Sequence, residues 1–141
     1  MKLNDAARDL IGTGADATLV TINPDGSPQV SVVWLALRST PDGDELVSAH
    51  LSEHKKVRNV RTDPRVAVTI LSLDAAGKGI RPYLSITGTA RITAGGAPEL
   101  LTELNPILGD PNLKFPPDDA PPGYLTHIRI DKVGGVGPWA G

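Results

Sequence analysis

Residues 50–64 read HLSEHKKVRNVRTDP, a short basic segment on which the interpretation of the fold depends. Four basic side chains fall within seven residues of it: Lys55, Lys56, Arg58 and Arg61. Ser52 is a suitable N-cap, Glu53 suits the first turn, and Asp63-Pro64 stops a helix. Val57 and Val60 give this helix a narrow apolar face. The segment therefore predicts one short helix with a basic start.

Runs rich in β-branched residues flank this helix on both sides. Three predicted strands precede it, at 17–22, 28–37 and 45–50, and three follow it, at 65–71, 80–93 and 124–133. Gly88, inside one of the later runs, predicts a bulge or the close approach of another backbone. Six short strands joined by turns close most naturally into a barrel. We therefore expect a mostly β fold with short helices, built as a six-stranded barrel.

Two further helices are expected, and one domain contains all these elements. Asn4 can cap a helix at about 5–12, and Pro98 can begin one at about 98–105 that Pro106 should end or kink. Residues 109–124 are too rich in proline for regular structure. The 141 residues suit a single core. We predict one domain over 1–141, with the N-terminal helix in residues 1–14 and a C-terminal tail at 134–141.

The composition limits the class of protein. The net charge is -2, whereas nucleic-acid-binding proteins usually carry a basic surplus. There is no cysteine, so disulfides and thiolate chemistry are excluded. No apolar run approaches the ~20 residues of a membrane helix, and Asp5, Arg8 and Asp9 do not suit a signal peptide. We expect a cytoplasmic protein that binds neither nucleic acid nor a membrane.

Motifs for nucleophilic catalysis and for Gly-rich phosphate loops do not occur. A metal site built from His50, His54 and His127 is conceivable. However, His50 should end a strand and His54 should begin a helix, which is not the arrangement of two histidines on one helix. We predict no metal and interpret these histidines as polar residues near a polar site.

The basic helix start has two interpretations. Lys55 and Lys56 lie in the first turn, where the helix dipole disfavours cations. An anion held by helix N–H groups and both ammonium groups would explain them. A solvated basic face that keeps the protein soluble is the alternative. Of the two tryptophans, Trp34 is expected to pack in the core by default, and Trp139 to pack onto a partner subunit.

Three segments in this order carry a resemblance: GSPQVSVVW (26–34), SEHKKVRNVRTDPRV (52–66) and ITGTARI (86–92). Together they resemble the pyridoxamine-phosphate-oxidase-like split-barrel family of flavin and deazaflavin proteins, over about 15–133. Lys56 and Asn59, followed by Asp-Pro-Arg-Val, form the most specific part. The resemblance implies a six-stranded split barrel that forms a homodimer, with a cofactor in a groove at the interface.

The resemblance also implies which residues bind the cofactor. The ring system would lie along the second strand, at Ser31, Val32, Val33 and Trp34. The phosphates would lie against the end of the third strand and the following helix, at His50, Ser52, His54, Lys55, Lys56 and Asn59. Arg81 and Trp139 of the other subunit could close the site. Family members often carry Thr at the position of His50 and Ser or Arg at that of His54. A histidine can still donate to a phosphate, and its charge would then make binding pH-dependent near ~6.5, the ordinary pKa of histidine.

The family uses flavin mononucleotide (FMN) or the 8-hydroxy-5-deazaflavin coenzyme F-420. The last strand, IRIDKV (128–133), lacks the R-x-H pattern of members that make pyridoxal phosphate, and the basic run looks like the deazaflavin branch. The expected function is therefore hydride transfer from reduced coenzyme F-420 to an electron-poor conjugated double bond of a small molecule. No residue is assigned as the proton donor. An FMN-dependent oxidoreductase, or a non-catalytic protein that binds a cofactor or tetrapyrrole, remains the alternative.

Overall fold

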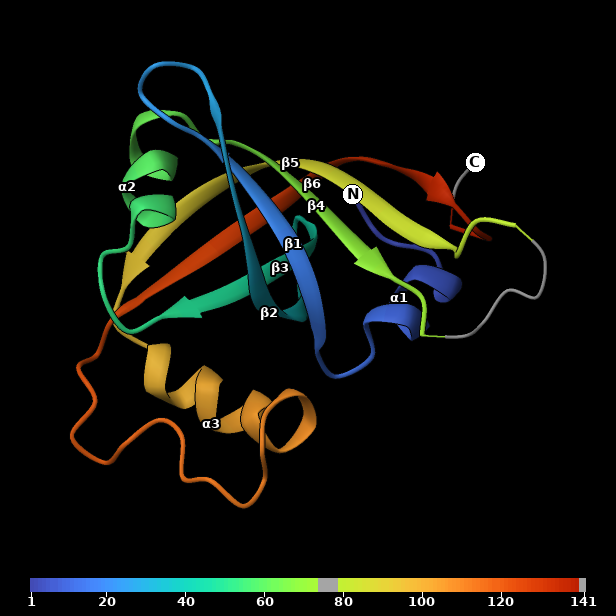
Figure 1. The fold of residues 1–141 in the computed structure, drawn as a ribbon. Helices are drawn as coiled ribbons and strands as arrows, with labels where there is room; N and C mark the ends of the chain where they lie inside the picture. Colours follow the sequence, from blue (N-terminus) through green and yellow to red (C-terminus); the bar gives the residue numbers. More distant parts are fainter. Residues whose placement is uncertain (74–78, 140–141) are drawn as a thin grey trace.

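A computed structural model describes residues 1–73 and 79–139, and within these ranges six strands close into an antiparallel barrel with three helices (Figure 1). Most of the predicted loop at 74–79 lies outside the described residues. The elements in chain order are α1 (Asp5–Ile11), β1 (Ala15–Ile22), β2 (Pro28–Thr40), β3 (Gly43–His50), α2 (Lys55–Thr62), β4 (Arg65–Leu71), β5 (Tyr83–Ala94), α3 (Ala97–Leu108) and β6 (Tyr124–Val136). The strands follow one another around the barrel as β1-β2-β3-β6-β5-β4. The six-stranded split barrel expected from the sequence is confirmed.

The barrel interior is filled by alternate residues of the strands. Val66, Val68 and Ile70 of β4 are buried, as their spacing predicts, and so are Ile128 and Ile130 of β6. The register of the β5–β6 ladder shifts between Thr87 and Gly88. Only glycine fits there, because a Cβ atom would collide with the carbonyl oxygen of Arg129. The bulge predicted at this glycine is therefore confirmed.

Helix α3 packs on the outside of the barrel, against β2 and β3. Leu100 and Leu104 form a second apolar cluster with Ala36 and Val47. This cover explains why the sequence of β2 is apolar on both faces in its second half. Pro106 is predicted to end or kink this helix; because the helix continues through Pro106 to Leu108, Pro106 does not end it. One lost backbone hydrogen bond is offset because Leu108 packs against the same cluster.

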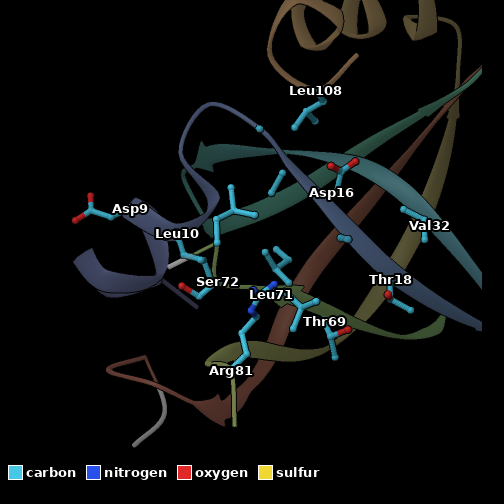
Figure 2. A pocket seen from close by; sticks show the side chains of 15 residues that line it. Asp9, Leu10, Asp16, Thr18, Val32, Thr69, Leu71, Ser72, Arg81 and Leu108 are labelled. Carbon is cyan, nitrogen blue, oxygen red and sulfur yellow. The ribbon is translucent and has the colours of Figure 1, made fainter. Parts of the chain in front are cut away.

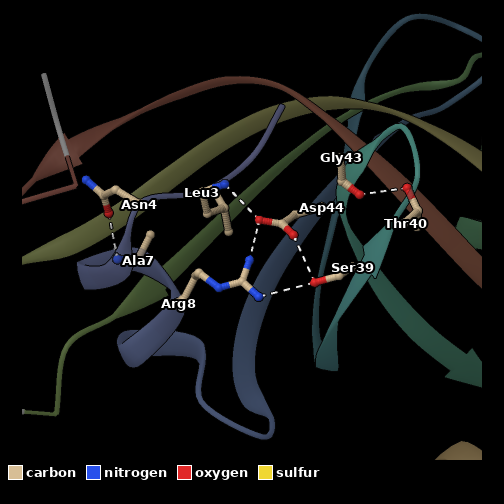
Figure 3. Close-up of polar contacts among 8 residues, drawn as sticks. All are labelled: Leu3, Asn4, Ala7, Arg8, Ser39, Thr40, Gly43 and Asp44. Atoms are coloured by element: carbon tan, nitrogen blue, oxygen red, sulfur yellow. Dashed lines mark hydrogen bonds and ion pairs between the residues drawn. The ribbon is translucent and has the colours of Figure 1, made fainter.

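The N-terminal segment is fastened to the β2–β3 hairpin by a buried carboxylate (Figure 3). Asp44 accepts hydrogen bonds from Arg8 at 2.6 Å and from the Leu3 N–H at 2.8 Å. Its other oxygen accepts a longer bond, 3.3 Å, from the hydroxyl of Ser39. Although desolvation opposes the charge, the bonds from Arg8 and Leu3 hold the pKa of Asp44 below its ordinary value. The carboxylate thus fixes helix α1, whose predicted Asn4 cap is confirmed by a bond from the Ala7 N–H.

The segment predicted to be a C-terminal tail is partly strand. β6 continues to Val136, and Trp139 then folds back into the core of its own chain. Its indole N–H donates to the carbonyl oxygen of Tyr83 at 2.7 Å, and only 9% of the residue is exposed. The expectation that Trp139 packs onto a partner subunit is therefore wrong. We call Leu3, Arg8, Asp44, Tyr83 and Trp139 the closed end of the barrel.

None of the three helices of the described chain is long and apolar enough to cross a membrane.

Candidate functional site

Strands β2 and β3 are hydrogen-bonded along only part of their length. The pairing runs from Ala36–Val47 to Thr40–Gly43 and does not extend beyond Ala36. From Pro28 to Leu35, β2 pairs with β1 on one side, whereas Ser48 to His50 of β3 pair with β6. Within the described residues, this half of β2 has no strand neighbour on its other side. We call this gap between 28–35 and 48–50 the open seam.

A pocket of about 300 Å³ lies in the open seam. We call it the seam pocket; its lining comprises Val32, Val33, Trp34, Ala49, His50, Leu51, His54, Lys56, Leu101 and Phe115. Six residues predicted from the sequence are brought together here: Val32, Val33, Trp34, His50, His54 and Lys56. One wall is therefore apolar and aromatic, and the other carries basic and imidazole groups.

Helix α2 begins at Lys55, two residues later than the predicted cap at Ser52 implies. The N-cap is His54, and no side chain caps the helix. Ser52 is instead engaged with His54: its carbonyl oxygen accepts from the His54 N–H at 2.9 Å, and its hydroxyl lies 3.1 Å from the His54 Nε2. Glu53 therefore lies outside the first turn and pairs with Arg61 at 2.8 Å. The helix start thus has uncapped N–H groups and no acidic residue, which favours an anion.

Lys56 points into the seam pocket and is partly buried. Burial lowers the pKa of its ammonium group, and no ion pair joins it to another residue in 1–73 or 79–139. A partly desolvated cation without a counter-charge is unfavourable, and an anionic ligand would relieve that cost. Lys55, by contrast, is exposed and lies outside the pocket lining.

His50 is almost fully buried at the end of β3, and its Nε2 lies 2.8 Å from the hydroxyl of Thr126. Desolvation first, and then the nearby Lys56 and His54, lower the pKa of His50 to about 4. His50 is therefore neutral at physiological pH. The expectation that its charge would make binding pH-dependent near ~6.5 is wrong for this residue.

The other predicted site residues lie outside the seam pocket. Asn59 is buried, and its side-chain amide donates to Thr21 at 3.0 Å and to Asn23 at 2.9 Å, which ties α2 to the end of β1. The hydroxyl of Ser31 is buried and has no hydrogen-bond partner among the described residues. Ser52 is exposed near His54. Arg81 lines a different pocket, and Trp139 belongs to the closed end. Contacts of these residues with a cofactor stay predictions.

Phe115 is a pocket residue that the sequence did not reveal. Its ring meets that of Trp34 edge to face, with 6.0 Å between the ring centroids. It comes from the proline-rich segment 109–124, which has no periodic pattern from which a contact could be inferred. Trp34 itself is half-buried, so it serves both the outer apolar cluster and the pocket wall.

A larger pocket of about 640 Å³ lies on the outer face of β1 and β4, beside α1 (Figure 2). We call it the outer pocket. Its lining is mainly aliphatic, with Arg81, Asp9 and Asp16 as the charged members. Val32 lines both this pocket and the seam pocket. The two pockets therefore meet at one residue of β2.

No cluster of three or more side chains suited to a metal ion occurs in the part of the chain that the structure describes. The donors of the seam pocket instead suit a phosphorylated, partly aromatic ligand. The sequence matches the family model described as pyridoxamine 5'-phosphate oxidase over residues 3–131.

The chain belongs to this family.

Solved structures place this member of the pyridoxamine 5'-phosphate oxidase family among several kinds of protein. A structure named F420 reductase is 25% identical, with a TM-score of 0.73 over 90% of this chain and 94% of that one. A conserved hypothetical protein of Mycobacterium tuberculosis is 21% identical, with a TM-score of 0.67 over 95% of this chain and 84% of the other. HutZ, the heme storage protein of Vibrio cholerae, is 15% identical, with a TM-score of 0.61 over 97% and 96%. The comparison with curated proteins gives no match.

These similarities establish the flavin-type oxidoreductase fold at the level of the family. The same fold includes a heme storage protein, so the fold alone does not assign an activity.

Proposed function

We propose that the protein is an oxidoreductase that uses coenzyme F-420 and transfers a hydride to an electron-poor conjugated double bond of a small molecule. The observation that carries this proposal is the seam pocket, in which an uncapped basic helix start faces an aromatic wall across an unpaired strand edge. The 25% identity with the structure named F420 reductase supports the choice of cofactor.

The residues of the pocket fit such a group. The N–H groups at the start of α2 and the ammonium group of Lys56 would hold a phosphate. Val33 and Trp34 would give the ring an apolar surface, and the unpaired edge of β2 would offer main-chain donors and acceptors to its polar rim. When bound, the reduced deazaflavin supplies the hydride.

Each pocket residue then has a definite task. Lys56 neutralises phosphate charge while it stays partly shielded from water. Neutral His50, held by Thr126, closes the base of the pocket without adding a charge. Phe115 and Leu101 exclude water from the side opposite the basic helix.

We also propose that two copies of the chain complete the site. The outer face of β2 and the end of β4 leave large apolar side chains uncovered, including Val32 at 72% and Leu73 at 91% exposure. Val32 is at once part of this exposed face and part of the seam pocket, so a second copy that covers the face would also cover the site.

FMN is the second candidate cofactor, because the matched family is named for pyridoxamine 5'-phosphate oxidase. Its phosphate would meet the same helix start, so the pocket itself accepts either ring system.

Titration of the purified protein with coenzyme F-420, FMN and heme, followed by absorbance and fluorescence, tests the proposal. We expect saturable binding of coenzyme F-420, at least about tenfold tighter than that of FMN. Turnover of the reduced coenzyme with a panel of enones should then follow. Tight binding of heme alone, or binding of the deazaflavin without its oxidation by any enone, would contradict the proposed reaction.

A further inference from the structure

We propose that Asn59 is a positioning residue of the seam pocket, which holds the start of α2 against the β1–β2 turn (23–27) so that Lys56 and the helix N–H groups bind a phosphate. In this role Asn59 acts through Lys56 and makes no contact with the ligand. The inference rests on the proposed function for the cofactor that carries the phosphate, but binding of phosphate itself can be measured without any cofactor.

The side chain of Asn59 is bonded to the barrel rather than directed to the seam pocket. Lys56, one helical turn earlier, lines the pocket, whereas Asn59 is outside the lining and only 3% exposed. The Nδ2 atom of Asn59 donates to the hydroxyl oxygen of Thr21 at 3.0 Å and to the side-chain oxygen of Asn23 at 2.9 Å. A primary amide has two N–H donors, and both are used within the protein. The amide therefore has no donor left for a phosphate.

The two acceptors of Asn59 are themselves held by hydrogen bonds. Thr21 is fully buried at the end of β1, and its hydroxyl lies 3.1 Å from the side-chain oxygen of Gln29 on β2. Asn23 donates through its side chain to the hydroxyl of Ser27 at 3.1 Å, and through its main-chain N–H to the Ser27 carbonyl oxygen at 2.8 Å. Figure 1 shows this turn beside α2. Asn59 thus connects the helix to two paired strands at one point.

Helix α2 depends on such a connection because it is short. It has eight residues and no side-chain cap at its start, whereas isolated helices below ~12 residues are marginal in water. Val57 and Val60 bury its apolar face, but apolar burial has no preferred direction. Hydrogen bonds do have one, so the two bonds of Asn59 fix how the helix is turned on the barrel.

A second connection holds the helix start from the solvent side. Arg58 donates to the Glu53 carbonyl oxygen at 2.6 Å, and Arg61 pairs with the Glu53 carboxylate at 2.8 Å. The side chains of Arg61 and Glu53 are 44% and 41% exposed, and exposed ion pairs contribute little. The buried bonds of Asn59 should therefore have the larger effect on the helix start.

Titration of the cofactor-free protein with inorganic phosphate, followed by the amide NMR shifts of residues 54–56, tests this role. Asn59→Ala should weaken phosphate binding about tenfold, a size typical of coupling within one hydrogen-bonded network. Asn23→Ala, a milder change outside the pocket, keeps the bond to Thr21 and should weaken binding about threefold. Glu53→Gln, at the exposed connection, should weaken it by about twofold or less.

Two controls separate positioning from a general loss of stability. Asp44→Ala removes hydrogen bonds at the closed end and leaves Asn59 in place, so it should bind phosphate like the unmodified protein. Lys56→Ala should itself weaken binding about tenfold. Adding Asn59→Ala to it should cost only about twofold more, because the ammonium group that Asn59 positions is already gone.

The assignment is overturned if the unmodified protein does not bind phosphate, if Asn59→Ala and Asn23→Ala bind it normally, or if Asp44→Ala loses as much affinity. Independent, multiplying losses in the double variant of Lys56 and Asn59 would overturn it too. If Asn59→Ala does not fold, Asn23→Ala, alone and combined with Lys56→Ala, decides between the same outcomes.

The proposed function fails separately. If phosphate binding depends on Asn59 but neither coenzyme F-420 nor FMN binds, only the cofactor is wrong. If coenzyme F-420 binds equally well to the unmodified protein and to Asn59→Ala, only the positioning role is wrong.

Discussion

The closed end and the open seam of the barrel are built on opposite principles. At the closed end, the buried carboxylate of Asp44 accepts from Leu3 and Arg8, and the indole of Trp139 donates to the carbonyl oxygen of Tyr83. The nearby β5–β6 ladder pairs twelve residues of each strand. At the open seam, β2 and β3 pair over only five residues of each strand. Lys56 forms no ion pair within residues 1–73 and 79–139, and the first turn of α2 holds no acidic residue. Figure 1 shows α1 and α2 towards different ends of the barrel. If the open seam is the binding site that we propose, stability and ligand binding should depend on different residues, and a substitution at one end should have little effect at the other.

Removal of the indole at the closed end should give the largest effect. Trp139→Ala is expected to lower the free energy of unfolding by about 3–5 kcal/mol, because it empties a core position and leaves the Tyr83 carbonyl without its donor. Urea denaturation measures this loss. Trp34→Ala is the matched variant at the open seam: it should cost less stability, because the ring is half-buried, but should weaken cofactor binding more. Equal stability losses in the two variants would break the comparison.

The second effect concerns the carboxylate of the closed end. Asp44→Ala should cost about 2–3 kcal/mol of unfolding free energy, because it unpairs Arg8 and the Leu3 N–H. The folded pKa of Asp44 lies below its unfolded value near ~3.9, so its contribution is complete above that value and is lost as the pH falls through the folded pKa. The variant should therefore lose less stability than the unmodified protein between pH 5 and 2, approximately. Parallel acid-unfolding curves would show that Asp44 carries no such charge.

Two adjacent lysines sharpen the description of the open seam. Lys56→Ala should weaken binding of coenzyme F-420 by about 1.5–3 kcal/mol, because it removes a charge-assisted contact inside the pocket. Lys55→Ala removes the same charge from the same helix turn but outside the pocket, so it should cost about 0.5 kcal/mol or less. Fluorescence titration measures both. If the two substitutions weaken binding equally, the helix attracts the cofactor only through its net positive charge, and the seam pocket is not the binding site.

The smallest expected effect is the pH dependence of binding due to His50. Since the pKa of His50 is lowered to about 4, its imidazole stays neutral from pH 6 to 8. The affinity for coenzyme F-420, divided by its value at pH 7, should then change with pH in the same way in the unmodified protein and in His50→Gln. Neither profile should show an inflection that depends on this residue. An inflection near ~6.5 that disappears in His50→Gln would show that the imidazole is exposed and charged.

Much of the fold could be predicted from local pattern. The alternation of β4, the Gly88 bulge and the valine face of α2 depend on neighbours in the sequence or on the backbone, and they are confirmed. The start of α2 differs from the prediction, because Ser52 is a good cap in isolation but is engaged with His54 in the fold. Helix α3 is longer than predicted, because tertiary packing of Leu108 outweighs the local penalty of Pro106.

The candidate site was predictable only where one continuous stretch supplies it. Lys56 and His54 follow from the basic helix, and Val32 to Trp34 from the apolar strand. Phe115 and the return of Trp139 to its own core depend on loops whose path the sequence does not encode locally. The neutral state of His50 likewise depends on burial by distant strands.

The half of β2 that has no partner in β3 also suggests how barrels of this kind can come to bind different ligands. The main-chain donors and acceptors of an unpaired strand edge persist through any substitution except proline. Mutations can therefore change the side chains around such an edge, and with them the ligand that fits, while the main-chain edge stays the same. A heme storage protein that is 15% identical to this chain and a structure named F420 reductase that is 25% identical share this barrel.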